Sequence, residues 1–340
     1  MLRTRMQDRL IFLIAPPRSG STLLARMLGA HSAVHAPAEP HLITPLAHLG
    51  YFGRVDAAAY DPIISEAGIR EVVRALPGGE DDYLDALRAY TDRLYAKLLE
   101  PAGCERLLDK TPAYALVLDF LARLYPHARY VVMTRHPIAV WASYVESFFD
   151  GDHEAAHVHN PLLERYVPAM GRFLRERPVP THHLRYEDLV QDPARELEKT
   201  CDFLGLAFEP QMVDYGEQAT GEATRGLGDP IAVAKQIRPT TTSLTRWTHD
   251  WAGQPGKVRQ GRELLARLSD PDLLTWGYER TALERELQAI PGVGAAGRTR
   301  GLSRYTLERR LLVRLRRNIH HNALGRLVRK IRWACDVLLR

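Results

Sequence analysis

The loop Ala15–Leu24 (APPRSGSTLL) combines residue types that can bind an anion at the start of a helix. The apolar run Leu10–Ile14 before it is short and is followed by two prolines, as expected of a strand buried on both faces. Leucine and methionine then recur at helical spacing, which predicts that the loop opens a helix. The backbone N–H groups and the dipole at that helix N-terminus favour a bound anion.

The same loop lacks the lysine of a nucleoside-triphosphate site. A Walker loop reads G-x-x-x-x-G-K-[ST], and its lysine reaches the terminal phosphates. Here Gly20 directly precedes Ser21, and the fixed cation of the loop is Arg18. The loop therefore predicts a phosphate-bearing ligand other than an ordinary triphosphate.

Strand and helix signals alternate through the body of the chain. Residues 130–133 and 181–186 predict two further strands, and Leu107-Leu108 a short one. Between them the sequence predicts helices over roughly 83–100, 112–125, 137–150, 161–175 and 193–205. This alternation favours an α/β fold with a P-loop-like parallel sheet flanked by helices.

Length and composition are those of an ordinary globular protein. The chain has 340 residues, of which 45% are hydrophobic and 26% charged, enough for one large α/β domain or a domain with an appendage. Three cysteines, odd in number and far apart, predict no disulfide framework and suit a reducing compartment. We find no signal-peptide core and no spanning apolar run, so the sequence predicts a cytoplasmic protein.

The basic character of the chain is concentrated at one end. Residues 298–340 contain 13 Lys and Arg against two acids, a local charge of +11, which leaves the remaining 297 residues at −6. The sequence predicts a domain over 1–290, a flexible linker over 291–303 and a basic amphipathic helical tail over 304–340. The tail could pack on the body or on a dimer partner, or lie on an anionic membrane surface or an acidic protein. Because aromatic residues hardly interleave its bases, nucleic-acid binding is disfavoured.

Two segments predict loops. Residues 216–256 are rich in Gly, Pro and Thr and predict a long functional loop rather than core. His153, His157 and His159 could suggest a metal cluster, but no second ligand set follows them, so the sequence predicts a polar loop and no metal.

Four blocks of the sequence resemble the sulfotransferases that use 3′-phosphoadenosine 5′-phosphosulfate (PAPS). They span about residues 8 to 280 and comprise PRSGSTLL at 17–24, YVVMTRHP at 130–137, YEDL at 186–189 with DP at 192–193 and FLGL at 203–206, and WGY at 276–278. AEPH at 38–41 and DKTP at 109–112 resemble the branch that holds tyrosylprotein and polyketide-associated sulfotransferases. The resemblance implies the sulfotransferase fold and PAPS as cofactor.

The resemblance also implies which residues bind that cofactor. The 5′-phosphosulfate would lie on the loop residues, and the 3′-phosphate on Arg135, which follows a strand, and on Ser143, two helical turns later. One departure is that Ser147 stands where related enzymes often carry another arginine. The full set is Arg18, Ser19, Gly20, Ser21, Thr22, Leu23, Arg135, Ser143, Tyr186 near the adenosine and, by weaker alignment, Arg246.

A glutamate, a histidine and a lysine are the candidates for the chemical step. In the branch that the chain resembles, the residue matching Glu39 takes the proton of the acceptor hydroxyl. His41 is the competing base, because histidine titrates near neutral pH without tuning. Lys110 matches a lysine that stabilises the leaving phosphate, and Arg18 would hold the transferring sulfonate.

The resemblance therefore implies transfer of a sulfonate from PAPS to a hydroxyl of a small molecule or a carrier-bound acceptor. One alternative is a P-loop-type kinase, which would need the missing lysine and a magnesium-binding carboxylate. The other is a non-catalytic protein that binds a membrane or partner through its basic tail. Residues 41–80, 150–160 and 216–256 are where we expect acceptor specificity to lie.

Overall fold

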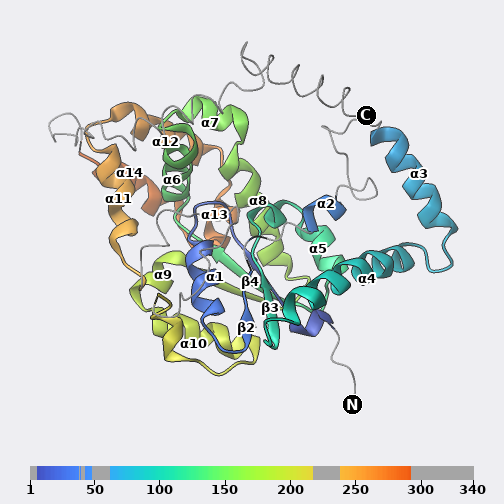
Figure 1. Cartoon of the computed structure of the whole chain (residues 1–340). Helices are drawn as coiled ribbons and strands as arrows, with labels where there is room; N and C mark the ends of the chain where they lie inside the picture. The colour runs from blue at the N-terminus through green and yellow to red at the C-terminus, as the bar shows by residue number, and fades with distance from the viewer. Residues whose placement is uncertain (1–5, 38, 40–42, 48–61, 217–237, 292–340) are drawn as a thin grey trace, which may run out of the picture.

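A five-stranded parallel sheet forms the centre of the structure, a computed structural model that describes residues 6–37, 39, 43–47, 62–216 and 238–291 (Figure 1). The strand order is β2-β3-β1-β4-β5, so β1 lies in the middle and pairs with β3 on one side and β4 on the other. The strands are β1 (Leu10–Ile14), β2 (Val34–His35), β3 (Arg106–Asp109), β4 (Arg129–Thr134) and β5 (Thr181–Arg185). The predicted α/β architecture is confirmed.

Helices cover both faces of the sheet. The α-helices are α1 (Ser21–Gly29), α2 (Ile43–Ala47), α3 (Pro62–Ala75), α4 (Glu80–Leu99), α5 (Leu118–Leu124), α6 (Pro137–Phe149), α7 (His153–His159), α8 (Leu162–Glu176), α9 (Tyr186–Gln191), α10 (Pro193–Leu204), α11 (Thr242–Trp251), α12 (Pro255–Ala266), α13 (Asp270–Thr275) and α14 (Arg280–Ala289). The short 3-10 helices are η1 (Met6–Arg9), η2 (Pro112–Leu116) and η3 (Pro210–Met212).

The alternation of side chains along the strands divides the core in two. Phe12 and Ile14 of β1 point into one cluster, whereas Ile11 and Leu13 point into the other. The first cluster is completed by α4, α5, α6, α8 and α11 to α14, and the second by α1, α9 and α10. Figure 1 shows α1, α9 and α10 together beside the sheet. Burial on both faces explains why β1 and β4 read as short continuous apolar runs.

The expected loop over 216–256 is partly wrong. Residues 242–251 form α11, and α12 begins at Pro255. Trp247 and Trp251 of α11 are buried, and their rings meet edge to face at a centroid distance of 5.5 Å. Two tryptophans four residues apart belong on one helix face, and burying that face outweighs the turn-forming composition around it. Residues 217–237 lie outside the described part of the chain.

The expected polar loop at the three histidines is also wrong, because His153–His159 form α7. Asp152 caps this helix, and its carboxylate accepts the backbone N–H of Ala155 at 2.9 Å. The His153 ring is buried and accepts the indole N–H of Trp141 at 2.9 Å. His157 faces Glu164, with 3.5 Å between Nε2 and Oε2. These contacts give two of the histidines structural partners.

Smaller differences concern one helix and the C-terminal region. The helix predicted over 112–125 is divided into η2 and α5 at Val117, whose φ of −129° is not helical. The predicted linker, from residue 292 onward, and the predicted tail lie outside the described residues. None of the helices that the structure describes is long and apolar enough to cross a membrane.

Candidate active site

The predicted anion loop joins β1 to α1 with two residues in the left-handed backbone region. Arg18 has φ of 68° and Gly20 has φ of 99°. The Ser19 hydroxyl donates to the Pro16 carbonyl at 2.8 Å, which closes the turn. A Cβ on Gly20 would lie 2.3 Å from Cδ2 of Tyr186, so the loop backbone packs directly on that ring. Glycine is required there by both conformation and space.

The start of α1 supplies the backbone donors of this loop. The first N–H groups of a helix have no acceptor within the helix, and here they belong to Ser21, Thr22 and Leu23. The side chains of Leu23 and Leu24 are buried in the core beneath α1. Leu23 can therefore contribute to an anion site only through its backbone N–H.

The second predicted anion residue, Arg135, lies against the loop. One guanidinium NH2 group (Nη1) donates to the Arg18 carbonyl at 3.1 Å, and the other (Nη2) donates to the Ser243 carbonyl at 2.9 Å. Its guanidinium carbon lies 4.2 Å from the centre of the Tyr186 ring. Burial lowers the pKa of Arg135, and its Nε is buried with no hydrogen-bond partner in the described residues.

Ser143 of α6 also lies at this point. Its hydroxyl accepts the Nε–H of Arg18 at 3.2 Å. The structure thus brings Arg18, Arg135, Ser143 and Tyr186 together, although the sequence spaces them over more than 160 residues.

Glu39 and Lys110, two of the residues predicted for the chemical step, contact each other in the structure. Nζ of Lys110 donates to Oε1 of Glu39 in an ion pair, and only 7% of the Lys110 side chain and 12% of the Glu39 side chain are exposed. Lys110 directly follows β3, and Glu39 lies in the segment after β2. The Glu39 carboxylate is therefore paired and mostly buried, and it is not exposed to solvent as a surface acid would be. His41, the competing base, lies outside the described residues.

The strand order explains why these groups converge. Lys110, Arg18, Arg135 and Tyr186 follow β3, β1, β4 and β5, which are consecutive neighbours in the sheet. Because the strands are parallel, their carboxyl ends meet at one edge, where α/β proteins bind ligands. The sequence indicated each strand end separately, and the sheet order joins them.

Arg246 was expected on a loop and lies instead on α11, where its side chain is exposed. Its Nε is 3.8 Å from Oδ2 of Asp250 on the next turn. The residue of α11 that touches Arg135 is Ser243, whose hydroxyl also lies 2.5 Å from the Tyr186 hydroxyl. The sequence did not predict Ser243. The pattern that could have indicated it is the pair of tryptophans, which marks the helix on which Ser243 lies.

Glu187, the second residue of the YEDL block, was not among the predicted site residues. Its carboxylate accepts the His136 backbone N–H at 2.9 Å and the Tyr278 hydroxyl at 2.5 Å. It therefore fixes the backbone next to Arg135 at the start of α6, and ties it to the WGY segment. The Trp276 carbonyl accepts the Thr134 hydroxyl at 2.9 Å on the other side of Arg135.

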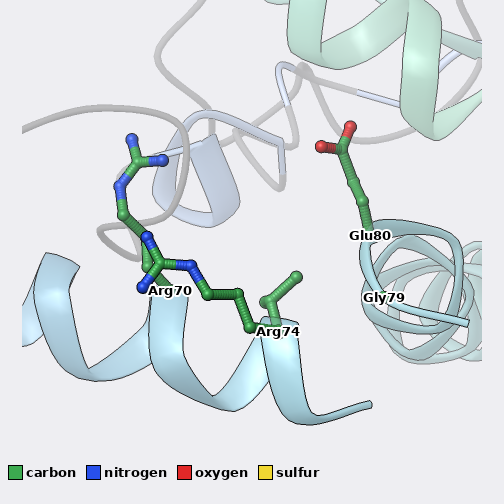
Figure 2. Close-up of a pocket in the computed structure, with 5 residues that line it drawn as sticks. Arg70, Arg74, Gly79 and Glu80 are labelled. Carbon is green, nitrogen blue, oxygen red and sulfur yellow. The ribbon is translucent and has the colours of Figure 1, made fainter. Parts of the chain in front are cut away.

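Two cavities lie away from this edge. One is lined by Arg70, Val73, Arg74, Gly79 and Glu80, and Figure 2 shows both guanidinium groups on one side and the Glu80 carboxylate on the other. The second is lined by residues of 151–154 and 254–260. Their lining lies largely in the segments where we expect acceptor specificity, but neither contains a residue predicted to bind the cofactor or to act in the chemical step. The residues gathered at the carboxyl ends of the strands therefore remain the candidate active site.

A model of the sulfotransferase family matches residues 10–210, which is more than half of the chain. The chain belongs to the sulfotransferase family. The matched range of this sulfotransferase-family protein begins at β1 and includes the anion loop, Glu39, Lys110, Arg135, Ser143 and Tyr186.

Two relatives are similar over long stretches of this sulfotransferase-family chain. The nodulation protein NoeE of Sinorhizobium fredii is 40% identical over 250 residues, which cover 66% of this chain and 57% of NoeE. The chain thus spans little more than half the length of NoeE. A putative protein-tyrosine sulfotransferase of Caenorhabditis briggsae is 28% identical over 290 residues, covering 81% of this chain and 91% of that protein.

Among solved structures, the sulfotransferase domain of the Synechococcus PCC 7002 olefin synthase is similar to this chain, with 26% identity and a TM-score of 0.47. That similarity covers 70% of this chain and 86% of that domain.

Proposed function

We propose that this protein transfers a sulfonate from PAPS to a hydroxyl group of its acceptor. The observation that carries the proposal is the cluster of Arg18, Arg135 and Ser143 at the start of α1, in a chain of the sulfotransferase family. Two arginines and a row of backbone N–H groups suit a ligand with two separate anionic groups.

PAPS, the proposed sulfonate donor, fits the polar groups at this edge of the sheet. Arg135 has a buried Nε without a hydrogen-bond partner in the described residues, and a buried donor of this kind calls for an acceptor. We assign the 3′-phosphate to Arg135 and Ser143, and the 5′-phosphosulfate to Arg18 and to backbone N–H groups of Ser19–Leu23. Tyr186 would face the nucleoside, and Arg246 remains the weaker candidate for a phosphate contact from α11.

The chemical step is an in-line displacement. The acceptor oxygen bonds to sulfur while the sulfur–oxygen bond to the 5′-phosphate breaks, so the products are a sulfate ester and 3′,5′-phosphoadenosine. As in phosphoryl transfer, charge lies on the peripheral oxygens, and positioning and electrostatics do most of the work.

Glu39 takes the proton of the acceptor hydroxyl in this scheme. Its present partner, Lys110, is a buried cation beside it that can also stabilise charge on the leaving phosphate. His41 is the alternative base. The names of relatives such as the putative protein-tyrosine sulfotransferase support a hydroxyl as the acceptor, and we propose a small molecule or a carrier-bound group as its bearer.

Calorimetry tests the donor directly. We expect 3′,5′-phosphoadenosine to bind tightly and ATP weakly, because the loop lacks the Walker lysine. Tight ATP binding with no binding of 3′,5′-phosphoadenosine would favour the kinase alternative and refute this proposal. A screen of hydroxylated acceptors with labelled PAPS, including tyrosine peptides, would then identify the acceptor.

The Glu39→Gln substitution tests the base. We expect kcat to fall by roughly 10²- to 10⁴-fold, the usual contribution of a general base, while 3′,5′-phosphoadenosine still binds. Glu100→Gln is the matched control, because it removes an exposed Lys–Glu ion pair with 2.6 Å between Lys97 Nζ and Glu100 Oε2. Equal activity of the two variants would remove Glu39 from the mechanism and leave His41 as the base.

The place of the protein in the cell is part of the same proposal. We propose a cytoplasmic enzyme whose basic tail, residues 304–340, contacts an anionic membrane surface, an acidic protein or a second copy of the chain. The local charge of +11 over residues 298–340 supports contact with an anionic membrane surface or an acidic protein.

A further inference from the structure

A fully buried carboxylate lies next to the catalytic lysine. Asp109 ends β3, directly before Lys110, and has 0% exposure. Three hydroxyl groups donate to it. They belong to Tyr95 of α4 at 2.6 Å, Tyr114 of η2 at 2.9 Å and Thr111 at 3.1 Å. A buried carboxylate needs such donors, so these distances fix the two tyrosine rings relative to the end of β3.

Tyr114 differs from Tyr95 in having a second partner. Its hydroxyl accepts the backbone N–H of Ile43 at 3.1 Å while it donates to Oδ2 of Asp109. Ile43 is the first residue of α2 and lies four residues after Glu39. Both tyrosine rings are 0% exposed, and burial raises the pKa of Tyr114, so its hydroxyl keeps the proton that it donates.

The hydroxyl of Tyr114 therefore joins the two segments that carry the catalytic pair. One segment leads from β3 to Lys110, and the other leads from Glu39 to α2. The Glu39–Lys110 ion pair is a second connection between the same two segments. Glu39 is thus held by its ion pair with Lys110, and the chain is anchored again four residues later, at Ile43. A glutamate restrained at both points has fewer arrangements available than one held by its ion pair alone.

We propose that Tyr114 is a positioning residue of the reaction, which holds the Glu39 segment in register with Lys110 through Asp109 and the Ile43 N–H. This inference rests on the proposed function for its effect on turnover, but its structural part does not. Tyr95 donates to the same Asp109 oxygen from α4, whereas the Ile43 N–H is bonded to Tyr114, so Tyr95 offers a matched comparison.

The test compares Tyr114→Phe with Tyr95→Phe. Each substitution removes one buried hydroxyl that donates to the same carboxylate oxygen, Oδ2 of Asp109, and keeps the aromatic ring. We expect Tyr114→Phe to lower kcat by roughly 10- to 100-fold, because misplacing a reacting group by about 1 Å can cost that much, with the KM for PAPS unchanged. Tyr95→Phe should lower the melting temperature comparably and leave kcat near the wild-type value.

Hydrogen exchange at the Ile43 amide gives a readout without turnover. We expect protection in the wild type, and exchange faster by about tenfold in Tyr114→Phe but not in Tyr95→Phe, as for one lost hydrogen bond. The proposal is overturned if the wild-type amide is unprotected, if both variants lose kcat equally, or if neither does. If no PAPS-dependent turnover exists at all but the exchange difference appears, the proposed function fails and the anchoring of the segment stands.

Discussion

The Gly20→Ala substitution should lower the free energy of unfolding and weaken the binding of 3′,5′-phosphoadenosine. The collision is specific, since a Cβ at this position would lie 2.3 Å from Cδ2 and 2.4 Å from Cε2 of Tyr186. The ring cannot simply turn aside. Its hydroxyl lies 2.5 Å from the Ser243 hydroxyl, and the guanidinium of Arg135 covers its face at 4.2 Å.

The expected cost has two parts. An alanine at the φ of 99° of this residue is strained, by about 1–2 kcal/mol. Forcing a buried ring to move adds about 1–3 kcal/mol, as in overpacked cores. Gly20→Ala should therefore lower the free energy of unfolding by roughly 2–5 kcal/mol.

Gly103 provides the matched control. It also has a positive φ, of 65°, but a Cβ there would meet nothing within 4 Å. Gly103→Ala should cost only the strain, and the loss of unfolded-chain entropy that accompanies any Gly→Ala change cancels in the comparison. The difference between the two variants isolates the collision with Tyr186.

The assays are urea unfolding for stability and calorimetry for 3′,5′-phosphoadenosine. Gly20→Ala should bind the nucleotide more weakly, because moving the Tyr186 ring also moves Arg135, and Gly103→Ala should bind it as the wild type does. If the two variants are equally stable and bind equally well, the packing of the loop on Tyr186 does not support the anion site, and the reasoning is wrong.

Two further predictions concern charge. Replacing Arg135 with lysine should weaken 3′,5′-phosphoadenosine binding by roughly 10- to 100-fold, the loss of a charge-assisted hydrogen bond, whereas Arg172→Lys, at an exposed ion pair, should leave calorimetric affinity unchanged. Burial lowers the pKa of His153 to about 4 from 6.5, so the folded state favours the neutral form of the ring. This contribution to the free energy of unfolding is fully present above about pH 6.5, and we expect roughly 2 kcal/mol of it to be lost as the pH is lowered to 5. His153→Gln, whose amide oxygen can still accept the Trp141 indole N–H, should lack that part of the pH dependence in urea unfolding; an unchanged profile would refute it.

The sequence predicted those features that depend on a few neighbouring residues. The apolar runs at 10–14 and 130–133 form strands that are buried on both faces. Such strands have no solvent-facing position for a polar residue, and the sequence pattern alone was therefore enough to predict them. The glycine and arginine of the anion loop, and Arg135 after its strand, belong to strand ends, and parallel strands bring their ends to one edge. The sequence indicated each of these strand ends separately and the family resemblance grouped Arg18 with Arg135, whereas the strand order in the structure brings the two residues into contact.

The contacts that the sequence did not predict join distant elements through polar atoms. Ser243 touches Arg135 across 108 residues by its backbone carbonyl, which any residue type could supply. The Tyr114 hydroxyl meets the Ile43 backbone N–H across 71 residues, again without a side-chain signature on one partner. Tyr95 reads as an apolar position of a helix, because its ring dominates the pattern and its hydroxyl leaves no periodic signal.

The partners of the cations suggest how the site accommodates an anion. The hydrogen bonds of Arg135 go to the carbonyl groups of Arg18 and Ser243, and its face lies on an aromatic ring, all of which are neutral groups. A phosphate that binds Arg135 thus gains a charged partner without displacing these neutral contacts. Lys110 is different, because its ammonium group already pairs with Glu39. In the mechanism that we propose, charge that Lys110 stabilises on the leaving phosphate weakens its hold on Glu39. That mechanism therefore couples the two halves of the site through this one lysine, and it releases the base as the leaving group develops its charge.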